Sequence, residues 1–294
     1  MTDACKNMVI PAFNLSEGCV WAVDKPVGWS SFHVVKRLRG AILSRVRKHG
    51  VKKLKVGHAG TLDPLASGVM LLCLGKATKS IELLQSGVKE YEAELQLGST
   101  TPSFDLETPV DATYPTAHIT PELIGEVLPR FVGTISQIPP AYSACKVEGV
   151  RAYEMARTGD EVKLKPKTLV IDSIDILGFD ADAMKLALRI VCSKGTYIRA
   201  MARDIGEALG SGAHLSALRR TRVGDYRIDD CMGIEDTVAA IWRSEITIPG
   251  NYGSPDAVIL PGEYTPRGNS ESAARDILPY AERAATETKL NKQQ

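Results

Sequence analysis

Long apolar runs and a basic leader segment are absent from this 294-residue sequence. No stretch approaches the roughly 18 consecutive apolar residues that a membrane-spanning helix needs. The opening residues, MTDACKNMVIPAF, contain no basic segment followed by a long apolar one, which a secretory signal would have. We therefore expect a soluble, cytoplasmic protein with no membrane partner.

Metal-binding spacings are missing as well. The cysteines stand far apart, with no CxxC pair and no histidine at zinc-ligand spacing: Cys5, Cys19, Cys73, Cys145, Cys192 and Cys231. Neither a cluster of metal-binding carboxylates nor a phosphate-cradling P-loop is present. We interpret the cysteines as reduced and mostly packed in the interior, and we expect no metal site.

Acidic residues are absent from one strongly basic block, although the net charge of the chain is only +1. Residues 36–55 contain nine cations: Lys36, Arg37, Arg39, Arg45, Arg47, Lys48, Lys52, Lys53 and Lys55. Such a block is typical of a surface that binds a polyanion and releases its counterions. A solvated basic helix explains the same residues equally well.

The hydrophobic pattern predicts a mixture of strands and helices. Strands are expected over residues 19–25, 68–75, 89–97, 169–176 and 185–192, and helices from Ser30 or Ser31 and over 77–85, 120–131 and 198–209. The first helix has an apolar stripe, so we expect its basic residues to face outward. From about residue 251 the composition shifts toward proline and glycine, which predicts a weakly folded or disordered tail.

The segment Gly57–Gly68, GHAGTLDPLASG, carries the most specific signal. Gly57 and Gly60 flank His58 and allow the backbone to approach another molecule closely. Asp63 precedes Pro64, which favours an extended conformation and a rigid loop. A carboxylate on such a loop suits a reactive site, but an Asp-Pro turn is also a common structural element, and these residues alone leave both interpretations open.

A longer stretch, GHAGTLDPLASGVMLLCLGKATK, closely resembles the motif of the TruB family of pseudouridine synthases. Further blocks resemble family blocks in the family's order: VDKPVGWSS, KEYEAELQLG, QIPPAYSACKVEGVRAYEMAR, CSKGTYIRAMARDIGEALG and GAHLSALRRTRVG. Six blocks spread over about 200 residues exclude coincidence.

The resemblance implies an α+β pseudouridine synthase fold, with a mixed, mostly antiparallel sheet, flanking helices and an RNA-binding insertion. It divides the chain into an N-terminal extension (1–18), a catalytic domain (19–235) with the insertion at about 139–168, and a short C-terminal appendage or disordered tail (236–294). The last segment shows no convincing PUA domain, a module with which many family members hold the tRNA.

The activity implied by the resemblance is conversion of uridine to pseudouridine at position 55, in the T-loop of tRNA. The enzyme must extrude the base from the folded loop before the base is cut from its ribose, rotated and rejoined through carbon. The partner is then the T-arm of tRNA. No metal, nucleotide or redox cofactor is expected, and the protein is expected to be monomeric.

The resemblance assigns roles to individual residues. Asp63 corresponds to the catalytic aspartate, which either attacks the nucleoside or removes a ribose proton, and the sequence does not choose between these routes. Arg199 corresponds to the arginine that pairs with that aspartate. His58 matches the histidine that enters the RNA loop, and Tyr91 the tyrosine that stacks on the flipped base.

Other matches are less specific. Tyr197 and Leu218 resemble lining residues of the uracil pocket, although simple packing explains either. Lys25 matches a lysine near the active site, and Asp105 a second aspartate that we expect to position RNA or the His58 loop. The remaining cations are expected to bind phosphate, Lys146 and Arg151 in the insertion and Arg219, Arg220 and Arg222 as an extension of the same surface.

Two alternatives belong to other functional classes. A tRNA-binding folding chaperone could share the fold, but a pure binder has no need to keep Asp63, Tyr91 and Arg199 together. An unrelated Asp-dependent hydrolase lacks support because its metal or phosphate motifs are missing. The chain also lacks the long lysine-rich tails expected of guide-RNA-dependent relatives.

Overall fold

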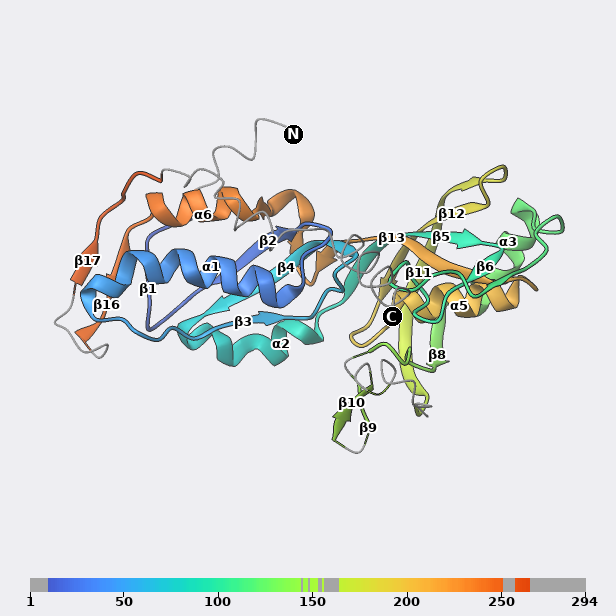
Figure 1. The fold of residues 1–294 in the computed structure, drawn as a ribbon, viewed down its shortest axis with the longest axis horizontal. Coiled ribbons are helices and arrows are strands. Elements are labelled where there is room, and N and C mark those ends of the chain that lie inside the picture. Colours follow the sequence, from blue (N-terminus) through green and yellow to red (C-terminus); the bar gives the residue numbers. More distant parts are fainter. Residues whose placement is uncertain are drawn as a thin grey trace, which may run out of the picture. The chain divides into compact units, whose positions relative to one another are not determined.

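The computed structural model describes residues 10–143, 145–147, 149–152, 155, 164–250 and 257–264. Two units are distinguished along the chain. The first combines the chain up to Gly87 with the chain from Arg220 onwards, and the second comprises Val88–Arg219. The second unit is therefore inserted, in sequence, into the first (Figure 1).

The first unit contains β1 (Phe13–Asn14), β2 (Val20–Lys25), α1 (Ser31–Val46), β3 (Val56–Ala59), β4 (Ala66–Leu74), α2 (Ile81–Ser86), β14 (Tyr226–Arg227), β15 (Met232–Gly233), α6 (Ile234–Arg243), β16 (Ile246–Ile248) and β17 (Ala257–Ile259). The second contains β5 (Lys89–Leu97), β6 (Ser99–Thr100), β7 (Ala112–Thr113), α3 (Pro121–Val127), β8 (Gly133–Gln137), β9 (Lys146–Val147), β10 (Val150–Arg151), β11 (Lys167–Asp180), β12 (Lys185–Cys192) and α5 (Ile198–Ala208). Strand β13 (Ala213–Val223) begins in the second unit and ends in the first.

Antiparallel pairing dominates both units. In the first unit the strand order is β15-β2-β4-β13, with β3 also paired to β4 and β14 to β13. In the second it is β13-β5-β12-β11-β8. The pairs β2–β4, β5–β12, β12–β11 and β11–β8 are antiparallel, whereas β15–β2 and β1–β16 are parallel. The predicted α+β class with a mixed, mostly antiparallel sheet is confirmed.

Helix α1 forms as the sequence predicts. The Ser30 side chain accepts a hydrogen bond from the His33 amide (3.2 Å) and so caps the helix. The whole apolar stripe is buried, namely Val34, Val35, Leu38, Ile42 and Val46. These residues share one core with alternate residues of β2 and β4 and with α6, which packs against α1 (Figure 1).

The expectation that all cations of this helix face outward is wrong for Arg45, which is buried. Its guanidinium donates to the carbonyls of Ile241, Ser244 and Leu260, the last two at 2.7 Å. Arginine suits this place because its planar fork can serve several carbonyl acceptors at once. Arg45 therefore anchors the segment that follows α6.

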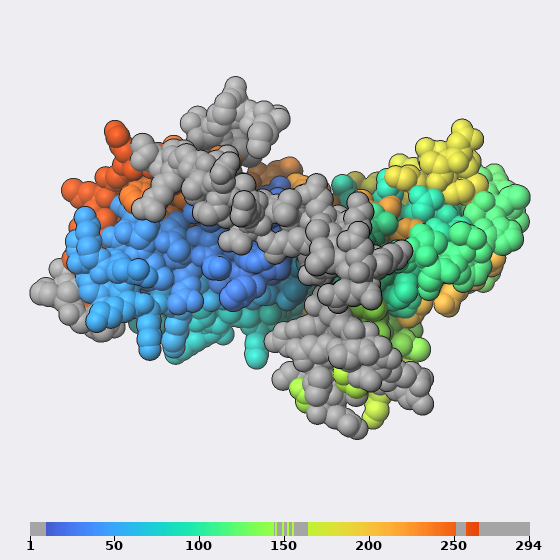
Figure 2. Space-filling model, in the orientation of Figure 1, coloured from blue at the N-terminus to red at the C-terminus, as the bar shows by residue number. Residues whose placement is uncertain are grey.

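Most of the basic block is nevertheless exposed. Arg37 is partly neutralised by a bidentate contact with Glu235 (3.0 and 2.6 Å). The remaining cations of the block reach solvent: Lys36, Arg39, Arg47, Lys48, Lys52, Lys53 and Lys55. Residues of helix α1, drawn in blue, are visible on the molecular surface in Figure 2.

Strand β4 is apolar from Gly68 to Leu74 because both of its faces are buried there. Met70, Leu72 and Leu74 point into the core with α1, whereas Val69 and Leu71 belong to a separate cluster on the other face. This arrangement explains the uninterrupted run GVMLLCLG. The helix predicted over 77–85 begins differently, as a 3₁₀ segment at Gly75–Ser80 that leads into α2.

The second unit follows its sequence pattern closely. Strands β5 and β12 have the predicted bounds, and their alternating residues are buried on one face. Helix α3 is capped by Thr120, as expected, and gives way to a 3₁₀ segment at Leu128–Phe131. Among the described residues, no helix is both long enough and apolar enough to cross a bilayer.

Part of the predicted C-terminal appendage contributes to the core of the first unit. Strand β16 pairs with β1, and Ile246 and Ile248 are fully buried. Helix α6 crosses the boundary predicted at residue 235. Within the tail predicted to be weakly folded or disordered from about residue 251, β17 pairs with β16, whereas residues 251–256 and those beyond 264 lie outside the described residues. Residues 144, 148, 153–154 and 156–163 of the predicted insertion lie outside them as well.

Candidate active site

Asp63 lies on a short loop of the first unit, between β3 and β4, that is fixed by hydrogen bonds from several sides. The carbonyl of Asp63 accepts from the Ala66 amide (3.1 Å), which closes a turn. The next carbonyl, that of Pro64, accepts from the Gly28 amide (2.8 Å). The preceding residue is tied to α1, because the Ser31 hydroxyl both donates to the Leu62 carbonyl (3.1 Å) and accepts from the Leu62 amide (2.9 Å).

Lys25 at the end of β2 supports the same loop. Its buried ammonium donates to the carbonyls of Trp29 (2.6 Å), Pro26 (2.9 Å) and Pro64 (3.4 Å). Burial lowers the pKa of Lys25 to about 8, opposed by the negative charge of Asp63. Lys25 therefore connects the turn after β2 to the Asp63 loop. Its ammonium also interacts electrostatically with the Asp63 carboxylate.

The pKa of Lys25 yields a testable pH dependence. The folded state releases this proton near pH 8, whereas an unfolded lysine holds it to about pH 10.4. Between these values the unfolded chain binds more protons, so this group makes the folded state more stable as pH rises. In Lys25→Met that contribution is absent. The stability of the wild type relative to Lys25→Met should therefore increase by roughly 1–2 kcal/mol from pH 8 to pH 10.

Urea unfolding of both proteins at pH 8 and pH 10 measures this difference. Lys55→Met, on the exposed basic segment, is the matched control and should track the wild type at both pH values. An unchanged difference between wild type and Lys25→Met would show that Lys25 keeps its proton throughout.

His58 lies in β3, opposite Leu72 of β4. Its Nδ1 is buried and makes no hydrogen bond to any described residue. Burial, followed by the positive charge of Arg220, lowers the pKa of His58, with only a partial opposing contribution from a backbone hydrogen bond at Gly60. His58 is therefore a neutral imidazole at physiological pH, and its buried Nδ1 has no partner among the described residues.

The expectation that Arg220 extends a phosphate-binding surface is wrong. Arg220 is only 2% exposed, and its guanidinium donates to the carbonyls of Val69 (2.8 Å) and Gly60 (3.1 Å). Gly60 has a φ of 95°, which favours glycine, and Gly68 packs so closely on the Arg220 backbone that a Cβ would clash. Arg220 thus holds the backbone on both sides of the Asp63 loop.

In the second unit, Tyr91 lies on β5, paired with Ile190 of β12. Its side chain is 9% exposed. Tyr91 occupies the buried face of the alternating strand, the same face as Ala93 and Leu95. The strand therefore holds the Tyr91 side chain in place, with a small part of the residue exposed.

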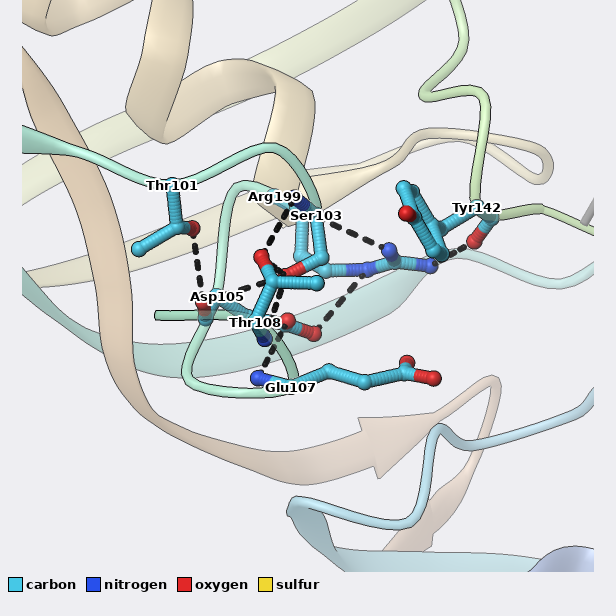
Figure 3. Close-up of polar contacts among 7 residues, drawn as sticks. All are labelled: Thr101, Ser103, Asp105, Glu107, Thr108, Tyr142 and Arg199. Carbon is cyan, nitrogen blue, oxygen red and sulfur yellow. Dashed lines mark hydrogen bonds and ion pairs between the residues drawn. The ribbon is translucent and has the colours of Figure 1, made fainter. Parts of the chain in front are cut away.

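Arg199 at the start of α5 is the centre of a buried polar network (Figure 3). Its Nε lies 3.6 Å from Asp105 Oδ2, and both side chains are about 95% buried (5% and 6% exposed). The guanidinium also donates to the carbonyls of Ser103 (3.1 Å) and Tyr142 (2.9 Å). Arg199 thus joins the loop after β6 to the start of the predicted insertion.

The loop that carries Asp105 is itself tightly bonded. The Asp105 carboxylate accepts from the Glu107 amide (2.9 Å), and its backbone carbonyl accepts from the hydroxyls of Thr101 (2.7 Å) and Ser103 (3.1 Å), as Figure 3 shows. Phe104 is held at a φ of 61°, a left-handed conformation that costs about 1–3 kcal/mol in a non-glycine residue. Such local strain persists only where contacts with surrounding residues hold the loop in one conformation.

Tyr197 and Leu218 are both half-buried. The Tyr197 backbone is fixed by Gln137, whose amide side chain accepts from the Tyr197 amide (2.9 Å) and donates to its carbonyl (3.2 Å). The Tyr197 hydroxyl lies 3.2 Å from the sulfur of Cys145. Burial, followed by the contact with Cys145, raises the pKa of Tyr197, so the phenol is neutral at physiological pH.

The predicted site residues therefore form two groups within the units. Lys25, His58 and Asp63 belong to the first unit, and Tyr91, Asp105, Tyr197, Arg199 and Leu218 to the second. The pairing of Arg199 with Asp63 stays a prediction, while Arg199 with Asp105 is an observed ion pair. The sequence did not reveal the roles of Ser31 or Arg220, because each contacts a segment distant in sequence.

Comparison with known proteins decides the family. Residues 47–198 match the family described as TruB family pseudouridylate synthase (N terminal domain), and residues 199–265 match the tRNA pseudouridylate synthase B C-terminal domain. The chain belongs to the TruB family of pseudouridylate synthases. The family resemblance drawn from the sequence blocks is thus confirmed.

Three TruB relatives align with this chain over 93–97% of their own length. The tRNA pseudouridine synthase B of Phocaeicola vulgatus is 62% identical over 233 residues, which cover 79% of this chain and 97% of the relative. That of Bacteroides thetaiotaomicron is 60% identical over 235 residues, with the same coverage. The enzyme of Flavobacterium johnsoniae is 47% identical and covers 74% of this chain and 93% of its own.

Solved structures support the fold. A Cbf5-Nop10-Gar1 complex contains a chain that is 30% identical, with a TM-score of 0.56, covering 76% of this chain and 54% of that chain. An H/ACA RNP bound to a substrate RNA containing 2'-deoxyuridine contains another, 29% identical with a TM-score of 0.53, covering 75% and 52%. This chain spans about half the length of those two chains.

Proposed function

We propose that this protein isomerises uridine to pseudouridine in tRNA, at position 55 in the T-loop. The observation that carries the proposal is the 62% identity to a tRNA pseudouridine synthase B over 97% of that relative. A chaperone role without chemistry is not favoured, because the relatives compared above are all synthases by name. We also propose that the protein acts in the cytoplasm, as a monomer.

Asp63 is the catalytic residue in this proposal. A flipped uridine is bound with its ribose beside the Asp63 loop, and the carboxylate either attacks the nucleoside or removes a ribose proton. The loop suits either role because backbone hydrogen bonds from Gly28 and Ala66 fix its position before the substrate arrives. The freed base then rotates, and a new bond forms between its C5 atom and the ribose.

Aromatic and apolar groups bind the flipped base. Tyr91 stacks on it, an interaction worth about 1–3 kcal/mol that does not discriminate between bases. Tyr197 and Leu218 line the pocket, and both have exposed surface available for a ligand. Burial on β5 supports this role for Tyr91, because a fixed ring loses little entropy when a base stacks on it.

Charged and polar residues hold the arrangement. Lys25 steadies the Asp63 loop, and Asp105 fixes the guanidinium of Arg199. His58, which is only partly buried, enters the T-loop as a neutral imidazole. The exposed cations of residues 36–55 add affinity through phosphates without reading sequence.

A tritium-release assay tests the proposal. An unmodified tRNA transcript labelled with tritium at C5 of uridine loses one tritium for each uridine that becomes rejoined through C5. We expect the intact chain to release one equivalent per tRNA, with chelator present. The matched control transcript carries cytidine at position 55 and should release none.

The outcomes separate the alternatives. Equal release from both transcripts would place the reaction at another uridine. Tight tRNA binding without release from either would favour the chaperone. An isolated T-arm hairpin should still be a substrate, since the proposed partner is the T-arm rather than the whole tRNA.

A further inference from the structure

Cys145 lies in a polar cluster of the second unit that the proposed chemistry does not use. Its sulfur is 3.3 Å from the Lys167 ammonium, which donates to it, and 3.2 Å from the Tyr197 hydroxyl. The side chain of Cys145 is half-buried, and Lys167 at the start of β11 is exposed. The thiol thus combines a cationic partner with access from solvent, which is the environment of reactive cysteines.

A buried hydroxyl completes the cluster. Ser143 is 3% exposed, and its Oγ makes no conventional hydrogen bond to any described residue. This hydroxyl lies close enough to act on both the Cys145 thiol and the Tyr197 phenol. An unpaired buried hydroxyl is costly, and a group attached to the Cys145 sulfur would offer it a partner.

The other described cysteines differ from Cys145. Burial raises the pKa of Cys19 to about 12, and those of Cys73 and Cys192 to about 11, while Cys231 is buried. For Cys145 burial also raises the pKa, but the nearby polar groups of Tyr197, Ser143 and Lys167 outweigh it and leave the pKa below the ordinary value. Within the described chain, Cys145 is thus the cysteine that best supports a thiolate.

We propose that Cys145 is a modification site for small disulfides, and that its modification switches off tRNA isomerisation. The switching half rests on the proposed function, because it depends on the proximity of Cys145 to Tyr197, a proposed pocket residue. The ligand class is a low-molecular-weight disulfide, whose attached half would be bonded to the Cys145 sulfur, next to the Tyr197 hydroxyl.

The reaction is a thiol–disulfide exchange. The Cys145 thiolate attacks one sulfur of the disulfide R–S–S–R, a new Cys145–S–S–R bond forms, and R–S⁻ leaves and takes up a proton from water. Lys167 stabilises the attacking thiolate through its ammonium. A reducing thiol reverses the exchange, so the modification acts as a reversible block.

Peptide-resolved labelling tests the site itself. The intact chain is treated with limiting iodoacetamide at pH 7, and each cysteine is quantified by mass spectrometry. We expect Cys145 to react at least about tenfold faster than Cys19, which is also half-buried. Lys167→Met should slow Cys145 roughly threefold or more, whereas Lys165→Met, an exposed neighbour, should not. Equal rates at Cys145 and Cys19, or no effect of Lys167→Met, would overturn the proposal.

Glutathione disulfide tests the switch. The treated chain should carry one glutathione at Cys145 and lose at least about tenfold in tritium release, and dithiothreitol should restore both. In Cys145→Ala, the ratio of treated to untreated activity should stay near one. Modification of Cys145 without loss of activity would overturn the switching half. An untreated chain with no activity at all would refute the proposed function and leave the labelling result standing.

Discussion

Asp63→Asn should release tritium from C5-labelled tRNA at least about 1000-fold more slowly than the wild type. Asparagine keeps the size of the side chain but can neither act as a base nor form the covalent bond of a nucleophile. The loop should survive, because its hydrogen bonds to Ala66, Gly28 and Ser31 involve backbone groups of the loop rather than the carboxylate. Single-turnover assays with enzyme in excess measure the chemical step directly.

Binding should separate this loss from misfolding. The affinity of Asp63→Asn for tRNA should stay within about threefold of the wild type, since phosphate contacts provide most of it. Asp225→Asn makes the same charge change on the exposed turn between β13 and β14 and should retain full activity. A wild-type rate in Asp63→Asn would reject Asp63 as the catalytic group.

Arg199→Met should destabilise the protein by about 3–5 kcal/mol. The substitution leaves the Asp105 carboxylate buried without its cation, and the carbonyls of Ser103 and Tyr142 without a donor. Arg199→Lys should also lower isomerisation by roughly 100-fold, because one ammonium cannot hold three acceptors in the geometry of a planar fork. Urea unfolding and single-turnover tritium release measure the two effects.

A double substitution tests whether the ion pair is the cause. Arg199→Met combined with Asp105→Asn removes both charges, so its loss of stability should be clearly smaller than the sum of the two single losses. Arg189→Met is a matched control, because its contact with Glu92 spans 3.9 Å between exposed side chains and should be worth little. Additive losses would mean that Asp105 and Arg199 contribute independently.

The strands were the most predictable part of the fold. β5 and β12 alternate strictly, since one face is buried and the other is not, and their bounds agree with the pattern. β4 was found from an apolar run with no alternation, which is what burial of both faces produces. The 3₁₀ segment that precedes α2 was not predictable from the sequence. Tertiary contacts decide whether so short a segment forms 3₁₀ or α-helical turns.

Buried arginines mark the limit of a prediction based on residue type. Arg45 lies seven positions after Leu38 and three after Ile42, so helical periodicity placed it on the apolar face, but its charge suggested solvent. Arg220 had no such signal, because its partners at Gly60 and Val69 lie far away in sequence. In both cases the position of the guanidinium is determined by backbone carbonyls. The sequence does not show which carbonyls will lie near it.

The functional residues were found through the family blocks rather than through local chemistry. An aspartate before a proline is compatible with many roles, and only the surrounding motif singled out Asp63. The ion pair between Arg199 and Asp105 was not predicted, because it depends on how the loop after β6 folds back to α5. The cluster around Cys145 depends likewise on contacts with Lys167 and Tyr197 that no motif records.

A crystal structure of the Asp63→Asn protein bound to an unmodified T-arm hairpin tests the central claim most directly. We predict that the target uridine is out of its stack and that the substituted side chain at position 63 lies about 3–3.5 Å from C1′ or C2′ of its ribose. A target base still stacked in the RNA loop, or a ribose that lies against Asp105 and far from residue 63, would contradict it.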